Sequence, residues 1–279
     1  MRRIPARPSI LVRARQELRA ALGLGRVRGF ARFARAVQGR SGLEIGGPSP
    51  VFTRTDRLPL YDRVGALDNC VFASSTVWAE QSHGYAFSPR RPAGRCHILD
   101  ASALTGLPDG GYDFVMSAHA LEHLANPVKA LREWLRVLRP GGPLVLVLPD
   151  RRHTFDHLRR PTPVAHMLED AARGVGEDDL AHLSEILELH DLSRDPGAGT
   201  PEQFRARSQG NATNRCLHHH VFDEANARGL LQAVGLEVEV VEPAGHLHLC
   251  LLARAPGGVR RPARGPAGSP PASPPSAPR

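Results

Sequence analysis

The fold is indicated most clearly by residues 112–149, which read YDFVMSAHALEHLANPVKALREWLRVLRPGGPLVLVLP. Residues 113–116 and 144–148 are short apolar runs, as expected for buried strands. Between them, residues 127–138 are predicted to form a helix that is ended by the Pro-Gly-Gly sequence after it. Its apolar side chains share one face, and they are Val128, Leu131, Leu135 and Leu138. The segment therefore predicts a strand, a helix and a second strand parallel to the first.

The same alternation extends on both sides of this segment. Upstream, strands are predicted at residues 43–45, 58–61 and 97–99. Downstream, Asp223 is a good N-cap for a helix to Val234, and strands are predicted at residues 238–241 and 248–253. This order is typical of an α/β fold with a mostly parallel sheet.

Polar residues follow the predicted strands at the edge where open parallel sheets bind ligands. The first strand runs into GLEIGGPS, residues 42–49, which lacks the glycine fingerprint of a dinucleotide site. Asp62 follows the second predicted strand, and Asp100 with Ala101 follows the third. A pyrophosphate needs glycine-lined backbone amides, whereas acidic residues beside a two-glycine turn suit a positively charged sulfonium. S-adenosylmethionine therefore fits these strand ends better than a nicotinamide dinucleotide.

The stretches LEIGG, ILDASAL and residues 112–149 resemble class I S-adenosylmethionine-dependent methyltransferases over residues 41–149, and more loosely over 221–254. The stretches LPDRRHTFDHLRRPTP and CLHHHVFD resemble a bacterial subgroup with a His-rich insert. The family implies a Rossmann-like seven-stranded, mostly parallel sheet flanked by helices. Its last strand is antiparallel and lies between its neighbours, and here a helical insert follows the fifth strand.

The resemblance also implies a set of cofactor-binding positions. Glu44, Gly46 and Gly47 would hold the methionine end, and Asp62 would hold the ribose. The adenine would lie by Asp100 and Ala101, with Ser117 beside the cofactor. The chain departs from the family at Gly47-Pro48-Ser49, where the common pattern is G-x-G, and proline lacks an amide donor.

Methyl transfer to oxygen or nitrogen requires alignment of the acceptor and removal of a proton. His119 is the favoured base because it follows the fourth predicted strand. His218 and His220 are further candidates, since alternate residues share a face of an extended chain. The pair Glu122-His123 is either an acid–base pair or a structural helix start. No metal site is predicted, although His218 and His220 could bind a metal together with His153, Asp156, His157, His182 or Glu185.

The chain divides into five regions. Residues 1–40 form a basic extension expected to be solvated, and residues 41–149 the cofactor-binding half. Residues 150–220 hold eight of the fourteen histidines and are expected to form a lid. Residues 221–254 close the sheet, and residues 255–279, rich in Pro, Gly, Ser and Ala, are expected to be disordered.

The net charge of +8 comes from the two ends of the chain. The ends contribute +10 and +4, which leaves −6 on residues 41–254, so no nucleic-acid partner is expected. No apolar run is long enough for a membrane span. The four scattered cysteines are expected to be reduced thiols in a cytoplasmic protein.

We therefore expect an S-adenosylmethionine-dependent methyltransferase acting on an O or N atom of a small molecule, a glycan or a secondary-metabolite intermediate. Two alternatives stay open at this point. One is a metal-dependent enzyme on a Rossmann-like scaffold that uses the His-rich insert, and the other is a non-catalytic partner subunit. The oligomeric state is not predicted.

Overall fold

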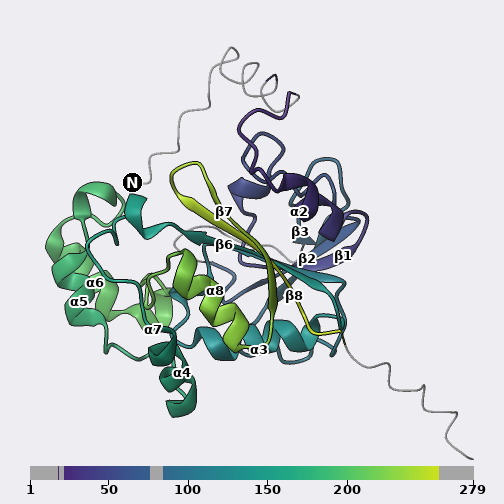
Figure 1. Cartoon of the computed structure of the whole chain (residues 1–279). Helices are drawn as coiled ribbons and strands as arrows, with labels where there is room; N and C mark the ends of the chain where they lie inside the picture. Colours follow the sequence, from purple (N-terminus) through teal and green to yellow (C-terminus); the bar gives the residue numbers. More distant parts are fainter. Residues whose placement is uncertain (1–17, 19–21, 76–83, 258–279) are drawn as a thin grey trace, which may run out of the picture.

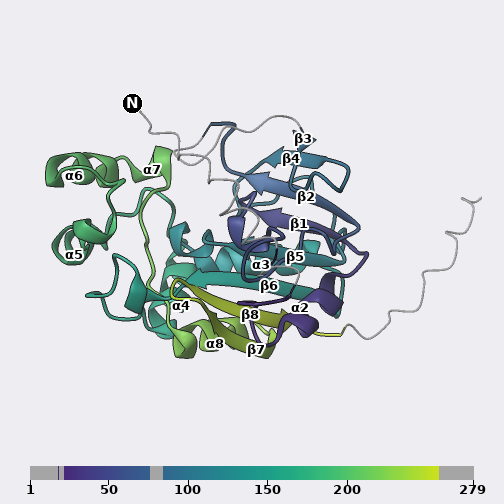
Figure 2. The same ribbon diagram turned by 90° about the horizontal axis from the view of Figure 1, so that it is seen from above.

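A computed structural model describes residue 18 and residues 22–75 and 84–257 of the chain. Its centre is an eight-stranded sheet (Figure 1), and Figure 2 shows the strands in the order β3-β4-β2-β1-β5-β6-β8-β7. The strands are β1 (Ser41–Ile45), β2 (Ala66–Val71), β3 (Gly84–Tyr85), β4 (Gly94–Ile98), β5 (Phe114–Ala118), β6 (Pro143–Pro149), β7 (Glu237–Ala244) and β8 (His248–Arg254).

The strand directions confirm the expected mixed sheet. Strands β4, β2, β1, β5 and β6 run parallel to one another. Strand β8 is antiparallel to both β6 and β7 and lies between them. The difference from seven strands is β3, a two-residue strand that pairs antiparallel with β4 at the edge of the sheet.

Helices cover both faces of the sheet. The helices are α2 (Phe30–Val37), α3 (Pro127–Val137), α4 (Val164–Arg173), α5 (Leu183–Leu189), α6 (Pro201–Gln209), α7 (Asn211–Asn214) and α8 (Glu224–Ala233). Short 3-10 turns are η1 (Pro50–Phe52), η2 (Leu121–His123), η3 (Arg151–His153) and η4 (Leu192–Arg194). Helices α3, α4 and α8 contribute to one core beside the sheet, and α2 and η1 contribute to a second core.

Helix starts follow the capping signals of the sequence. The Asn126 side chain accepts a hydrogen bond from the Lys129 amide at the start of α3. Asp223 and Asn226 form a reciprocal capping box at the start of α8, as the predicted N-cap requires. These capping bonds satisfy amides that the first turn of a helix leaves without a partner.

The strand predicted at residues 58–61 is wrong. These residues form a loop, and the second strand is β2, which begins at Ala66. Leu58, Leu60 and Tyr61 are fully or almost fully buried because the loop packs onto the core that contains η1. Their apolar character therefore reflects burial of a loop, and the error moves the end of the second strand from Asp62 to Val71.

The basic extension is also corrected where the structure describes it. Helix α2 is packed on the sheet, and its Phe33 and Val37 side chains are fully buried. Residues 30–37 are therefore part of the folded domain rather than a solvated arm. Most of the tail expected to be disordered, residues 258–279, lies outside the described residues. No described helix is both long and apolar enough to cross a membrane.

The insert after β6 contains α4, α5, α6 and α7. Figure 2 shows α5, α6 and α7 beyond the ends of the sheet toward which the β1 and β2 arrows point. Ile186, Ala198, Phe204 and Leu217 form a small core of their own within this region. Within the insert, α5 covers only Leu183–Leu189.

Candidate active site

The turn after β1 has a backbone that favours glycine. Gly46 and Gly47 have φ values of 82° and 83°, in the left-handed region. A Cβ at Gly47 would lie 2.5 Å from Oε1 of Glu44, so a larger residue would clash there. A Cβ at Gly46 would meet only the Cβ of Ala120, at 3.7 Å. The Gly46 position is therefore open and close to the end of β5.

Glu44 lies beneath this turn and has no solvent exposure. Its carboxylate accepts hydrogen bonds from Ser49 Oγ at 2.7 Å, from Tyr61 Oη at 3.0 Å and from Tyr85 Oη. Burial raises the pKa of Glu44 to about 7, although the hydrogen bonds from Tyr85, Ser49 and Tyr61 oppose this rise. Because both oxygens already have protein partners, Glu44 supports the turn from within the protein.

Asp62 does not lie at the end of a strand. Its carboxylate accepts hydrogen bonds from Ser88 Oγ and Arg90 Nη1, each at 2.9 Å. The residues that follow β2 are Phe72, Ala73, Ser74 and Ser75, with no carboxylate among them. The predicted position of Asp62 at the end of a strand is therefore wrong, because residues 58–61 do not form a strand. The contact with the ribose was inferred from that position.

Asp100 and Ala101 directly follow β4 and Leu99, close to the expected position. Asp100 Oδ1 accepts the Ser102 amide at 2.8 Å, and Oδ2 accepts Arg215 Nη2 at 3.0 Å. Burial raises the pKa of Asp100, but the bonds from Ser102 and Arg215 outweigh it and the net pKa is lowered. Asp100 is therefore a carboxylate at neutral pH, and an arginine of the insert covers it.

The end of β5 carries Ser117 and His119. Ser117 is fully buried and donates to the Ile45 carbonyl at 3.2 Å, so it joins β5 to β1. His119 has a φ of 52°, an uncommon conformation for a residue other than glycine. Its Nε2 lies 2.8 Å from Nδ1 of His248, and its Nδ1 lies 3.6 Å from Oε1 of Glu122.

Glu122 is fully buried in η2, and neither of its oxygens has a hydrogen-bond partner among the described residues. Burial raises its pKa, but the imidazoles of His119, His123 and His218 lower it more, so the net pKa lies below its usual range. Burial and the neighbouring His119 lower the pKa of His248 to about 4. The end of β5 thus combines an anionic carboxylate, a neutral histidine and the partly exposed His119.

His218 and His220 are buried, and their hydrogen-bond partners differ from those of His119. His218 Nδ1 lies 2.5 Å from Oδ2 of Asp156, and this carboxylate raises the pKa of His218 against the effect of burial. His220 Nε2 donates to the Ala125 carbonyl at 3.1 Å. His218 therefore joins two parts of the insert and His220 joins the insert to the loop after β5, and neither side chain faces solvent.

Four contributors to the site were missed in the sequence, namely Tyr61, Tyr85, Arg215 and His248. Tyr61 and Tyr85 hold Glu44, and Arg215 covers Asp100. No spacing pattern marks these long-range contacts. His248 had a usable signal, because an antiparallel strand beside β6 brings its first residue, His248, opposite Pro149 at the same sheet edge as His119.

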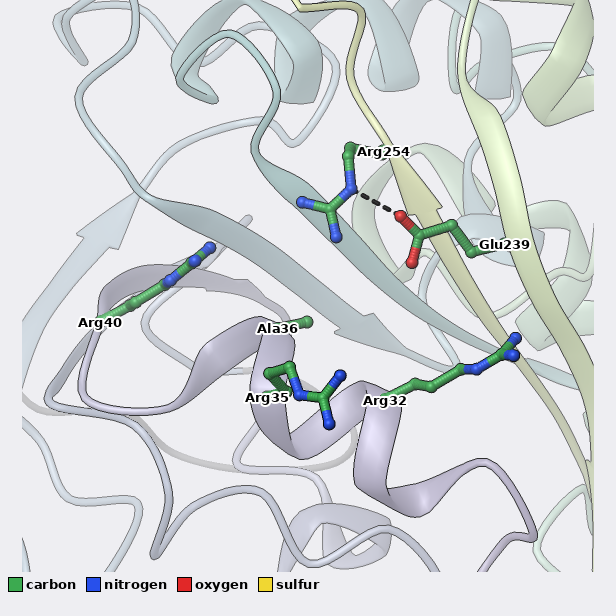
Figure 3. Close-up of a pocket in the computed structure, with 6 residues that line it drawn as sticks. All are labelled: Arg32, Arg35, Ala36, Arg40, Glu239 and Arg254. Carbon is green, nitrogen blue, oxygen red and sulfur yellow. Dashed lines mark hydrogen bonds and ion pairs between the residues drawn. The ribbon is translucent and has the colours of Figure 1, made fainter.

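A separate cavity of about 500 Å³ lies on another part of the molecule. It is lined by α2, β7 and β8, and Figure 3 shows Arg254 paired with Glu239 in it. Arg254 is opposite Pro143, the first residue of β6, so this cavity is at the amino-terminal edge of the parallel strands. It is distinct from the carboxyl-end residues described above.

Two comparisons of the sequence each match a part of the chain. A family model described as a methyltransferase domain matches residues 77–146. An uncharacterized 37.1 kDa protein in transposon TN4556 of Streptomyces fradiae is 50% identical over 59 residues, which are 21% of this chain and 17% of that protein. The matched part is thus less than a fifth of the relative's length.

Solved structures with a similar chain path include two S-adenosylmethionine-dependent methyltransferases. The one from Aquifex aeolicus has 14% identity and a TM-score of 0.43, over 89% of this chain and 99% of that one. The one from Mesorhizobium loti has 16% identity and a TM-score of 0.47, over 81% and 95%. A Burkholderia thailandensis 1,6-didemethyltoxoflavin-N1-methyltransferase has 12% identity and a TM-score of 0.44, over 91% and 93%.

Proposed function

We propose that this chain, in which residues 77–146 match a methyltransferase domain, is a class I S-adenosylmethionine-dependent methyltransferase that methylates an O or N atom of a small molecule, a glycan or a secondary-metabolite intermediate. We propose an oxygen or nitrogen acceptor because His119 lies between Glu122 and His248 at the end of β5. A base at this position suits acceptors that must lose a proton.

The strand ends fit the cofactor in part. The open Gly46 position and the anionic Asp100 suit, respectively, the methionine end and the adenine amino group. We propose Gly46, Gly47, Asp100 and Ala101 as the cofactor-binding residues, with Glu44 and Ser117 supporting the turn and the strand beneath them. Asp62 is not proposed for the ribose. When bound, the cofactor supplies a methyl group already activated by its sulfonium.

His119 acts as the general base in this proposal. The imidazole takes the proton from the acceptor O–H or N–H at Nε2 as the new bond to carbon forms, and for this the acceptor must first displace Nδ1 of His248 from that nitrogen. Glu122, buried and anionic beside Nδ1, stabilises the positive charge that then develops on the ring. His248 is neutral and orients the ring through Nε2. Because His119 precedes Ala120, it lies close to the open side of the Gly46 turn.

We further propose that residues 150–220 form a lid that selects the acceptor. Two contacts of the insert support this: Arg215 with Asp100, and Glu177 with the Ala125 amide at 3.1 Å. Both fasten the insert to the carboxyl ends of the strands or to the loop after β5. In this arrangement His218 and His220 are positioning residues that hold the lid.

Calorimetry with S-adenosylhomocysteine tests the cofactor assignment. Asp100→Ala should weaken binding about tenfold or more, because a charge-assisted hydrogen bond contributes about 1.5–3 kcal/mol. The exposed Asp178→Ala is the matched control and should bind like the unchanged protein. Absence of binding to the unchanged protein would contradict the proposal.

Turnover tests the base. We would follow release of S-adenosylhomocysteine with a panel of phenols, sugars and amines. His119→Ala should reduce turnover of an accepted compound by about 10²–10⁴-fold and change cofactor affinity by less than about threefold, since the imidazole acts on the acceptor. Unchanged turnover in this variant would show that another group removes the proton.

A further inference from the structure

A second group of histidines and a carboxylate lies in the insert, away from His119. His166 and Asp170 are four residues apart on α4 and therefore on the same face of the helix. His182 is the N-cap residue of α5. One ligand atom from each of the three lies within 4.8 Å of the other two. Two helices of the insert thus meet at this group.

The distances match those between neighbouring ligands of one metal ion. His166 Nε2 lies 3.1 Å from His182 Nε2 and 3.3 Å from Asp170 Oδ2. Two ligand atoms at zinc bond lengths of about 2.0–2.1 Å and a tetrahedral angle are separated by about 3.3 Å. Two of the three separations therefore match those around one ion, and the third, between Asp170 and His182, is within 4.8 Å.

The hydrogen bonding of this group is incomplete without a further positive partner. Asp170 is 1% exposed, and its Oδ2 has no hydrogen-bond partner among the described residues. Leaving a buried carboxylate oxygen without a partner is costly, and such atoms require an explanation. The His166–His182 contact supplies at most one shared hydrogen. A cation that accepts lone pairs from all three atoms satisfies them together.

Surrounding residues orient the three side chains as outer partners do around metal ions. Arg173 Nη2 donates to Asp170 Oδ1 at 2.5 Å, which leaves Oδ2 as the single ligand atom of that carboxylate. Glu185 Oε2 lies 3.9 Å from His182 Nδ1, on the ring nitrogen opposite the proposed ligand atom. The His220 ring packs beside both histidines.

We propose that His166, Asp170 and His182 bind one divalent transition-metal ion, with Zn²⁺ as the expected ion for two imidazoles and one carboxylate. The ion joins α4 to the start of α5 and so fixes the shape of the insert. His166 is one-third exposed, which leaves the remaining coordination position facing the outside of the cluster. The site does not depend on the proposed methyl transfer.

The other group that could hold a metal consists of Glu122, His123 and His218. It adjoins His119 and is part of the site proposed above for proton transfer. The sequence alone had grouped His218 and His220, whereas the structure places His218 in this group and His220 beside the other one. Variants of the two groups therefore distinguish where a metal binds.

The test uses the full chain after removal of metals with a chelator. Co²⁺ is titrated as a spectroscopic probe, and Zn²⁺ is then used to displace it. We expect one equivalent of Co²⁺ to bind, with the visible absorption of a low-coordinate site. His166→Ala and Asp170→Asn should each weaken binding about 100-fold or more, since loss of an outer partner already costs about 10–100-fold.

His153→Ala is the matched control, because His153 is an exposed histidine of the insert outside both groups. It should bind Co²⁺ like the unchanged protein. Zn²⁺ should raise the melting temperature of the unchanged protein and of this control, but not that of His166→Ala. The conservative Asp170→Asn change keeps the helix sequence otherwise intact, which separates loss of metal from loss of fold.

Two outcomes would overturn the proposal. One is the absence of stoichiometric Co²⁺ or Zn²⁺ binding by the unchanged protein. The other is binding that persists in folded His166→Ala and Asp170→Asn but is lost in Glu122→Gln, which would assign the metal to the group beside His119.

Discussion

At the scale of single residues, Glu44, which lies beneath the proposed cofactor turn, should make the free energy of unfolding depend on pH. Its folded pKa of about 7 lies above the ordinary value of 4.5. The folded chain therefore binds more protons than the unfolded chain between these values, and stability falls as the pH rises through this window. The main cause is burial, since Glu44 has no exposed surface.

Glu44→Gln should remove this pH dependence. Raising the pH from about 4.5 to about 7 should cost the unchanged protein about 3 kcal/mol more than it costs the variant. The measurement is the free energy of unfolding in urea at several pH values, with the exposed Glu188→Gln as control. Parallel pH profiles for Glu44→Gln and the unchanged protein would show that Glu44 is ionised in the fold without penalty.

At the scale of elements, α2 tests whether the basic N-terminal region belongs to the domain. Phe33→Ala should destabilise the protein by about 3–5 kcal/mol, because it empties a fully buried aromatic site. Leu24→Ala, at a side chain that is 57% exposed, should change stability by less than about 0.5 kcal/mol. Both values come from urea unfolding, and equal effects would mean that α2 is not packed in solution.

One buried guanidinium, that of Arg159, stabilises the folded conformation of the insert. Arg159 is 1% exposed and donates to Asp156, to the carbonyls of His218 and His219, and to Glu185. Arg159→Ala leaves the buried Asp156 without one of its charged partners, and we expect a loss of about 3–5 kcal/mol. Limited proteolysis should then cut within residues 150–220, whereas the exposed neighbour Arg160→Ala should stay resistant. Equal resistance of the two variants would contradict this role.

The elements also show what the sequence could predict. Helix α3 was predicted almost to its boundaries because its apolar face and its Pro-Gly-Gly stop lie within one segment. The strand at residues 58–61 was wrong because a buried loop and a buried strand have the same apolar composition. The pair Arg215–Asp100 joins residues 115 positions apart, and no local pattern indicates it. The pair His119–His248 follows only once the antiparallel strand β8 is placed beside β6.

At the scale of the whole molecule, the parallel order of strands followed from the alternation of strands and helices, and the placement of the insert followed from its start after β6. The side-chain contacts of the insert could not be predicted from the sequence, because they depend on which buried histidines lie beside which carboxylates. Those histidines also determine how the entire fold responds to acid.

Four histidines, two of them buried and two partly buried, should make the protein sensitive to acid. Burial is the main cause that lowers the pKa of His123, His220 and His248 to about 4 and that of His219 to about 3. Their stabilising contribution is present above the unfolded pKa of about 6.5 and is lost as the pH falls toward the folded values. Near pH 5, unfolding takes up four protons at these histidines and releases one from Glu44. The free energy of unfolding should therefore fall by about 4 kcal/mol for each pH unit of acidification.

Urea unfolding of the metal-free protein between about pH 5 and pH 6.5 measures this slope. The Asn211 amide lies 2.9 Å from His219 Nε2 and donates to it, which requires that nitrogen to be unprotonated. His219→Gln should accordingly reduce the slope by about 1.4 kcal/mol per pH unit, whereas His153→Ala, at an exposed histidine, should leave it unchanged. A flat profile, or stability that increases on acidification, would show that the effect of Glu44 dominates and that these histidines are protonated in the folded protein.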